Sequence, residues 1–257
     1  MDRSLLTASQ TRFRIAVRLR TFCLLLVLAT PAAAWAGSFQ VNPIRIDLSS
    51  SKRIVAERVT NTGTAPVVVQ MSVMSWSQDE GKDVLAPTRE IIVSPPIATI
   101  EPGKEQIVRV GLRRAPDAKR ELSYRLYVRE VPPPPKPGFQ GLQVALRIGL
   151  PIFVQPREGQ AKPALVWSAR LTDSKTIRLS VENRGTGHIQ ISELALSEAG
   201  QKTPVAQQDG LAYVLAGQSR RWELALKRPL HDKNERLHLN ASTDAGRLET
   251  EIEVAGR

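Results

Sequence analysis

GLQVALRIGLPIFV, residues 141–154, is the stretch that decides the fold. Apolar residues occupy every second position from Leu142 to Leu150, which is the period of a β-strand with one apolar face. The alternating run ends at Pro151, and a proline without a backbone N–H predicts a strand edge or a bulge there. A strand of this kind offers its apolar row either to the chain's own core or to another chain.

The first 36 residues predict an export signal. A segment rich in arginine precedes the apolar run 22–28, and Ala34-Trp35-Ala36 has the small-x-small pattern of a cleavage site. The apolar run is shorter than the roughly 20 residues that cross a bilayer. We therefore expect a mature chain that starts near Gly37, is soluble outside the cytoplasm and inserts stably into no membrane.

Cysteine content and charge narrow the function classes. Cys23, the single cysteine, lies inside the predicted signal, so the mature chain has neither disulfide nor thiol chemistry. Removing residues 1–36 takes away five arginines and one aspartate, which lowers the formal net charge by four, from +11 to +7. The positive residues are scattered and aromatic residues make up 5% of the chain, unlike the basic stripes and aromatic platforms of nucleic-acid binders. We therefore expect acidic proteins or envelope surfaces as partners, and no nucleic acid.

A short motif that occurs twice in the sequence predicts two domains. VTNTGT at 59–64 and VENRGT at 181–186 each end an alternating strand with the Asn and Gly of a tight turn. Their offset of 122 residues is about the length of one β-sandwich domain. The polar stretch 155–163, which is bounded by prolines, separates the two halves. The predicted domains are residues 37–156 and 157–257.

Short alternating segments predict an all-β protein with immunoglobulin-like sandwiches. Pro43 predicts an edge position or a change of sheet within residues 39–48, and residues 77–83 read as a polar turn. Pro95 and Pro96 exclude a central ladder position. The expected strands are 39–48, 54–60, 66–76, 91–93, 106–112 and 122–130, and then 164–171, 176–182, 188–197, 211–215, 219–226, 235–241 and 247–254.

Motifs for catalysis and metal binding are missing from the sequence. His188, His231 and His238 lack the spacing of metal ligands, and we expect structural roles for them. There is no G-x-S-x-G elbow, and Asp79-Glu80 lies in a hydrophilic turn. Gly185-Thr186-Gly187 lies between strands rather than before a helix, so it forms no phosphate cradle. We therefore expect a protein that is not an enzyme and binds neither a cofactor nor a metal.

Four consecutive prolines, residues 132–135, precede the opening stretch. The run suits either a polyproline ligand of an adaptor domain or a stiff connector between two strands. In an exported protein the connector is favoured. It would hold the start of the 142–150 strand at a fixed distance.

A series of short motifs runs through the predicted first domain. Its members are Arg45, Ser94-Pro95-Pro96, Ile100-Glu101-Pro102-Gly103, QIVRV at 106–110, Tyr124-Arg125, Glu130-Val131-Pro132, LQVAL at 142–146 and Ile152-Phe153. In this order they resemble the periplasmic chaperones of the chaperone–usher pilus pathway. The resemblance covers most of residues 39–156 and is weaker beyond them. The short loop 131–141 and the missing cysteine pair resemble the short-loop chaperones, or the branch that serves spore-coat-like pilins.

The resemblance implies two immunoglobulin-like domains set at an angle. Such a chaperone lends the last strand of its first domain to a pilin subunit that lacks one strand, and delivers the subunit to an outer-membrane usher. Each lent side chain would contribute ~1.5–3 kcal/mol before ordering costs. The alternative is that these side chains only fill the chain's own core. A free strand also predicts self-association of the unliganded protein. The residues that would be lent are Leu142, Val144, Leu146 and Ile148.

The resemblance further implies a cleft in which two cations hold the C-terminal carboxylate of the subunit. Arg45 matches the first cation, and its guanidinium suits bidentate binding of a carboxylate. Pro151 stands where the family has the second cation. Arg147 either takes over the role of this cation or is simply a solvated surface residue. The residues that match the family's interdomain charge network are Arg109, Glu121 and Asp244.

The competing hypothesis is an exported two-domain β-sandwich that acts as an adhesin or a ligand-binding module. Such a protein would have an aromatic or polar loop cluster at one end of a sandwich. Trp76, Trp167 and Trp222 lie within strand patterns, where core packing is their simpler use. We therefore favour the assembly chaperone.

Overall fold

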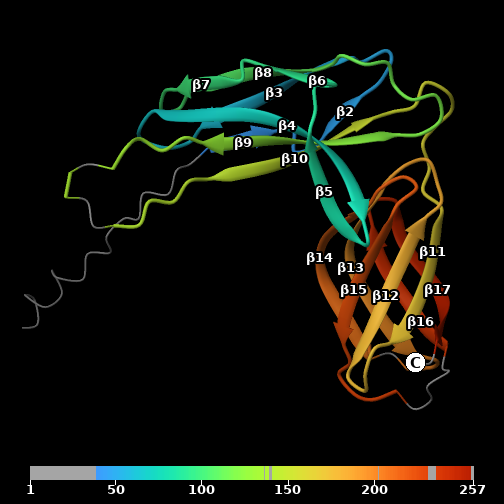
Figure 1. The fold of residues 1–257 in the computed structure, drawn as a ribbon. Helices are drawn as coiled ribbons and strands as arrows, with labels where there is room; N and C mark the ends of the chain where they lie inside the picture. The colour runs from blue at the N-terminus through green and yellow to red at the C-terminus, as the bar shows by residue number, and fades with distance from the viewer. Residues whose placement is uncertain (1–38, 136, 139–140, 202, 231–235, 256–257) are drawn as a thin grey trace, which may run out of the picture. The chain divides into compact units, whose positions relative to one another are not determined.

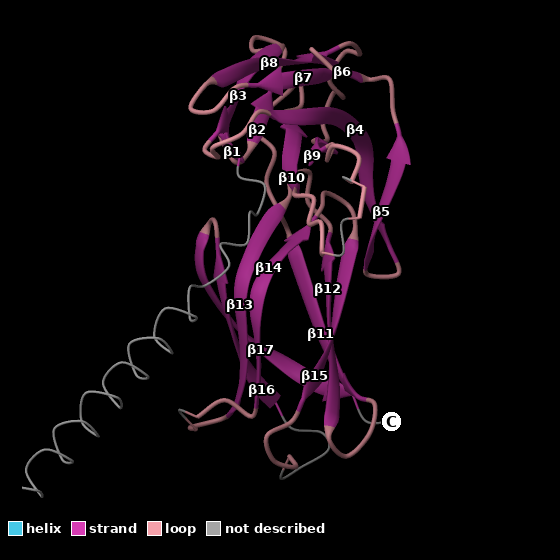
Figure 2. Cartoon of the chain, turned by 90° about the vertical axis from the view of Figure 1, so that its left-hand side faces the viewer, coloured by secondary structure: helices cyan, strands magenta, loops and turns pink. Residues whose placement is uncertain are grey.

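The computed structural model describes residues 39–135, 137–138, 141–201, 203–230 and 236–255, and the predicted export signal and His231 lie outside them. The described residues form strands and loops without a helix, which confirms the all-β prediction (Figure 2). This part of the chain therefore has no helix long and apolar enough to cross a membrane. All of the described residues belong to one compact unit.

Two sheets are built from the strands that precede residue 155 (Figure 1). Their inward side chains form a first hydrophobic cluster, in which Val59, Val108 and Leu126 are fully buried. The first sheet has the order β1 (Phe39–Asn42), β3 (Ile54–Asn61), β8 (Glu105–Leu112), β6 (Ile91–Ser94). The second has the order β2 (Ile46–Leu48), β10 (Arg147–Val154), β9 (Leu122–Glu130), β4 (Val67–Asp79), β5 (Lys82–Pro87), and β7 (Ile97–Ile100) pairs with β4.

The chain passes from the first sheet to the second at Pro43. β1 lies at the edge of the first sheet beside β3, and β2 lies at the edge of the second beside β10. The change of sheet predicted from Pro43 is therefore confirmed.

Seven strands form the second half of the chain. Their order is β14 (Ala206–Val214), β13 (Ile189–Glu198), β16 (Arg236–Thr243), β17 (Gly246–Ala255), β11 (Leu165–Leu171), β12 (Thr176–Asn183), β15 (Ser219–Ala225). A short parallel pairing joins β17 to β11. Side chains from both sides of this joint, including Leu179, Leu196 and Leu239, form a second hydrophobic cluster. All seven strands were expected, although β14 begins at Ala206 rather than at residue 211.

The first half contains two strands that the sequence did not predict. Residues 77–83, expected as a polar turn, continue β4 to Asp79 and begin β5 at Lys82. Every residue of β5 is exposed at the edge of its sheet. Because no face of this strand is buried, its sequence carries no two-residue period. β7 follows Pro95 and Pro96 and pairs with β4 alone.

Glu57 places a carboxyl group in the core of the first half. It follows the inward parity of Val55 and Val59 on β3, and it is 0% exposed. Neither carboxyl oxygen has a hydrogen-bond partner of good geometry among the described residues. Desolvation raises the pKa of Glu57 to about 7, and the backbone of Asn42 opposes this rise. The core therefore holds a carboxyl group that is protonated at acidic pH.

Candidate functional site

β10 presents a free backbone edge along part of its length. It pairs antiparallel with β9 over all of its residues, from Arg147 to Val154. On the other side, β2 pairs in parallel with residues 152–154 only. Among the described residues, no strand therefore covers residues 147–151 on that side (Figure 1). An unpaired edge of this kind accepts a further strand.

β10 begins later than the strand predicted for residues 142–150, and the reason lies in its partner. The register with β9, continued beyond Arg147, sets residues 142–144 opposite Pro134–Pro132. Prolines have no backbone N–H, so the ladder loses its donors on that side. Gln143 Nε2 instead donates a hydrogen bond to the Pro133 carbonyl at 3.0 Å.

The alternating apolar row becomes more exposed towards its N-terminal end. Leu150 is 3% exposed, whereas Val144 is 58% and Leu142 is 87% exposed. Leu146 and Ile148 are partly buried against the first hydrophobic cluster. Packing within this chain therefore accounts for the C-terminal part of the row. Leu142 and Val144 remain open to another surface.

Pro151 lies inside β10, in the part of the strand whose edge towards β2 is unpaired, which agrees with the edge position predicted for this proline. In the β9 ladder Pro151 pairs with Arg125. In the β2 ladder Ile152 pairs with Ile46, which aligns Arg45 with Pro151 one residue earlier. A proline fits this position because β2 pairing starts only after it. Aligned residues direct their side chains to the same face, so the Arg125 side chain lies on the face of Pro151, and Arg45 lies in the bend directly before β2.

An aromatic cluster lies against the two arginines. The Phe153 ring packs with Trp76 and Tyr213, at centroid distances of 6.1 and 5.8 Å. Arg45 Cζ lies 5.2 Å from the centroid of the Phe153 ring, and Arg125 Cζ lies 3.9 Å from that of Trp76. Desolvation raises the pKa of the Tyr213 hydroxyl, and the charges of Arg45 and Arg125 oppose the rise. The guanidiniums of Arg45 and Arg125 therefore both lie against rings of this one aromatic cluster.

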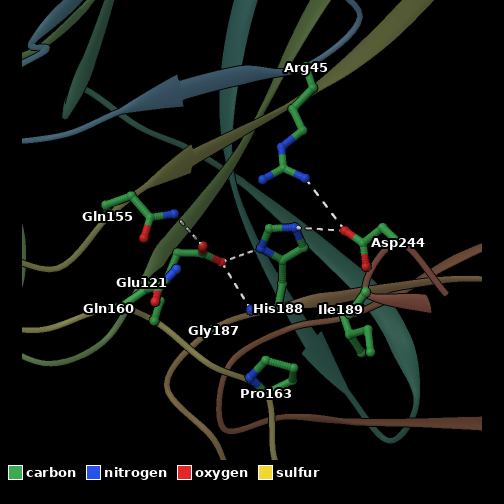
Figure 3. Close-up of a pocket in the computed structure, with 11 residues that line it drawn as sticks. Arg45, Glu121, Gln155, Gln160, Pro163, Gly187, His188, Ile189 and Asp244 are labelled. Carbon is green, nitrogen blue, oxygen red and sulfur yellow. Dashed lines mark hydrogen bonds and ion pairs between the residues drawn. The ribbon is translucent and has the colours of Figure 1, made fainter. Parts of the chain in front are cut away.

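Arg45 also lines a pocket of about 290 Å³ (Figure 3). In it His188 Nδ1 lies 2.5 Å from Glu121 Oε1, and Gln155 Nε2 donates to Glu121 Oε2 at 3.1 Å. Asp244 Oδ2 lies 3.5 Å from Arg45 Nη1 and 4.0 Å from His188 Nε2. The pocket thus joins charged groups from both halves of the chain.

His188 is a site residue that the sequence did not reveal. Its side chain is 5% exposed and stacks on Phe153, with ring centroids 3.4 Å apart. Nε2 has no hydrogen-bond partner within the described residues. No cluster of His, Cys, Asp and Glu suited to a metal occurs in this part of the chain. Glu121 is 67 positions away from His188, so no local spacing marks the contact.

Two of the three residues matched to an interdomain charge network line this pocket. They are Glu121 and Asp244. Arg109 is exposed on β8 in the first sheet, and no ion pair joins it to either carboxylate in the described part of the chain. Glu121 instead contacts His188 and Gln155.

Arg147 lies at the start of β10, away from this pocket. Its Cζ is 3.8 Å from the centroid of the Tyr127 ring. That ring lies across Gly149, where a Cβ atom would come within 2.9 Å of Tyr127 Cε1. Glycine at position 149 therefore lets the ring lie across the strand.

The β4–β5 hairpin, part of which was expected as a polar turn, contacts the second half of the chain. Gln78 Nε2 donates to the Tyr213 carbonyl at 2.7 Å, and the Leu215 amide donates to Gln78 Oε1 at 3.0 Å. Arg220 Nη1 donates to Asp83 Oδ1 at 3.1 Å. The hairpin therefore helps to fix Tyr213 against Trp76 and Phe153.

Comparison with known proteins finds a family match for the first half of the chain. Residues 38–160 match the family described as pili and flagellar-assembly chaperone, PapD N-terminal domain. Chaperone protein FimB/FhaD of Bordetella pertussis is 28% identical over 192 residues, 69% of this chain and 77% of that protein. Chaperone protein PapD of Escherichia coli is 28% identical over 105 residues, 39% of this chain and 43% of that protein.

The fold is also found in solved structures. One is the CsuC–CsuE complex of a chaperone and a tip adhesion subunit from the archaic chaperone–usher Csu pili of Acinetobacter baumannii. The match has a TM-score of 0.64 and 23% identity, and it covers 86% of this chain and 99% of the matched chain.

Proposed function

We propose that this chain, whose residues 38–160 match the family of pili and flagellar-assembly chaperones, is a periplasmic chaperone that binds pilin subunits along β10 and delivers them to an outer-membrane usher. One observation carries the proposal. The free backbone edge at residues 147–151 continues into a row whose first members, Leu142 and Val144, are exposed. A subunit that lacks one strand needs both a backbone edge and an apolar row from its partner.

The edge supplies hydrogen bonds and the row supplies apolar contact. In strand addition, backbone pairing provides affinity and alternate side chains enter pockets of the partner. A slip of one residue would turn the polar face inward, so the row also fixes the register. Burying Leu142 and Val144 would contribute ~1.5–3 kcal/mol each before ordering costs. Leu146 and Ile148 are already partly buried and would contribute less.

β2 limits how far an added strand can extend. It occupies the edge of β10 from Ile152 onward, so an added strand has to end or turn away beside Pro151. Arg45 lies at this position. If the added strand is the last strand of a subunit and runs parallel to β10, as β2 does, its terminal carboxylate comes to Arg45, which suits bidentate binding. Arg45 would then fix the register of the bound strand.

Co-expression with a pilin subunit in a bacterial periplasm tests the proposal, with the amount of soluble subunit recovered on the chain as the readout. Val144→Asp places a carboxylate in the row, and we expect recovery to fall by roughly tenfold or more because an unpaired charge is costly to bury. Ala145→Asp adds the same charge at the neighbouring exposed position of opposite parity, and recovery should be retained. Equal recovery with both variants would contradict binding through the row.

The tryptophans do not favour the alternative of an adhesin or a ligand-binding module. Trp76 is buried against Phe153. Trp167 and Trp222 stack with ring centroids 6.1 Å apart, and both pack on the second hydrophobic cluster. These aromatic side chains serve packing rather than an exposed ligand platform.

A further inference from the structure

Two arginines flank a glycine on the outer face of the first sheet. Arg109 and Gly111 belong to β8, and Arg113 follows its end. The Arg113 amide donates to the Glu90 carbonyl at 2.8 Å, which continues the pairing of β8 with β6 to this residue. Val110, between the first two, is fully buried, so the alternate residues face outward. Alternate residues of a strand are ~6.8 Å apart, and the two cations therefore start ~14 Å apart.

Two exposed isoleucines lie on either side of Gly111. Gly111 pairs with Ile54 on β3 and with Ile92 on β6, so the three residues form one row across the sheet. Ile54 is 64% and Ile92 48% exposed, and they start ~10 Å apart. Across the sheet, a Cβ atom on Gly111 would come within 4 Å only of Ile54 Cγ1, at 3.7 Å. The row is therefore apolar at both ends and open in the middle.

The two guanidiniums beside this gap are available to a partner. Arg109 and Arg113 are exposed, and neither has an ion pair within the described residues. Among the outward residues of β3, β6 and β8, the one carboxylate is Glu105, and Arg58 holds it at 3.1 Å. The carboxylates that would neutralise the two free guanidiniums therefore have to come from another molecule.

The spacing selects the conformation and the chemistry of that molecule. An extended segment laid along β8 has the same two-residue period as β8. Its residues i, i+2 and i+4 can therefore face Arg109, Gly111 and Arg113. Acidic residues at both outer positions suit the guanidiniums, and an apolar residue between them fills the gap in the isoleucine row. A helix would place residues i and i+4 only ~6 Å apart along its axis, which is too short.

We propose that this face is a docking site for an extended segment of another protein, in which an apolar residue has an acidic residue two positions before it and two positions after it. No two acidic residues of this chain that are four positions apart enclose an apolar one, so a second copy does not supply the segment. The site belongs to the first sheet and β10 to the second. Docking therefore leaves the free edge of β10 uncovered, and the inference does not rest on the proposed function.

Two peptides of one composition test the site. The probe is fluorescent Ser-Glu-Thr-Leu-Thr-Glu-Ser with blocked ends, and the control is Ser-Glu-Glu-Thr-Leu-Thr-Ser. The readout is fluorescence anisotropy with the purified mature chain. We expect the probe to bind about fivefold more tightly than the control, because only the probe matches both cations and the gap. Equal binding of the two peptides would show attraction by net charge alone and would contradict the site.

Substitutions on this face separate the gap from the charges. Gly111→Leu fills the gap, and we expect it to weaken probe binding by about tenfold while urea denaturation stays nearly unchanged. Arg109→Gln and Arg113→Gln should each weaken it by about threefold, as for an exposed ion pair. Arg247→Gln removes the same charge from an exposed position on β17 and should have no effect. Equal losses with Arg109→Gln and Arg247→Gln would overturn the proposal.

Two further measurements exclude other uses of this face. Vesicles of phosphatidylglycerol and phosphatidylcholine in equal amounts test a membrane as the occupant. If the native chain binds these vesicles and neither peptide, the face serves a membrane and the proposal is wrong. Recovery of a co-expressed pilin subunit should be the same for Gly111→Leu and the native chain. A folded Gly111→Leu variant that recovers no subunit would contradict a site independent of β10.

Discussion

The imidazole of His188 stacks on the ring of Phe153, with centroids 3.4 Å apart and an angle of 6° between their planes. Phe153 belongs to β10, which carries the free edge, and His188 directly precedes β13 in the second half of the chain. Through Nδ1 the same imidazole contacts Glu121, which is nearly fully buried. One buried ring thus links the second half of the chain to the strand proposed for subunit binding.

His188→Ala should destabilise the protein through two effects. It removes the stacking partner of Phe153 and leaves the buried Glu121 carboxylate without its imidazole. We expect the free energy of unfolding to fall by about 2–4 kcal/mol, measured by urea denaturation. His238→Ala, at a half-exposed position on β16, should change it by less than about 0.5 kcal/mol. A similar effect of both substitutions would contradict a special role for His188.

Glu57 should make stability depend on pH. Its pKa in the folded state is about 7, above the ordinary value of 4.5, so the folded protein keeps a proton that the unfolded chain loses between these values. The contribution of this group to stability is therefore greatest below pH 4.5, falls as the pH rises to about 7, and is constant above. The full change corresponds to about 3 kcal/mol.

Urea denaturation of Glu57→Gln across this pH range checks the assignment. The variant should lose the decline between pH 4.5 and 7 and be more stable than the native chain at pH 8. Glu249→Gln, at an exposed position on β17, should retain the decline. A Glu57→Gln profile that still parallels the native one would show that the decline has another source.

Gly185 should tolerate no side chain. A Cβ atom there would overlap the Lys162 carbonyl oxygen and the Ala164 amide, both of them backbone atoms that cannot move aside easily. We expect Gly185→Ala to lower the free energy of unfolding by about 1–3 kcal/mol. At Gly111 a Cβ atom would meet only Ile54 Cγ1, at an ordinary 3.7 Å. Gly111→Ala should therefore be close to neutral, and equal losses would argue against this steric cause.

Sequence periodicity predicts an element well where one of its faces is buried. The strands of the second half follow this rule, and so does the C-terminal part of the apolar row, where β10 forms and Leu150 is buried. β5 could not be predicted from periodicity because all of its residues are exposed. The inward parity of Val55 and Val59 also places Glu57 in the core, so this buried carboxyl could have been read from the same pattern.

The site was harder to predict because its contacts join distant residues. The resemblance pointed to Arg45, Glu121 and Asp244, which meet in the pocket. It also pointed to Arg109, which lies in the other sheet, because a match of motifs does not specify which strands are neighbours. The late start of β10 depends on the prolines opposite residues 142–144, which is a property of the pairing and not of the strand itself. Arg125 aligns with Pro151 only once the register is known.

Thiol accessibility along the donated segment tests the central claim most directly. Cys23 in the predicted signal is the single cysteine of the sequence, so one introduced cysteine at a time can be followed in the mature chain. Cysteines at positions 142, 143, 144 and 145 should all react with a thiol reagent in the free protein. Once a pilin subunit is bound, we predict that positions 142 and 144 become protected while 143 and 145 keep reacting. Uniform reactivity, or protection without this alternation, would contradict donation of the strand.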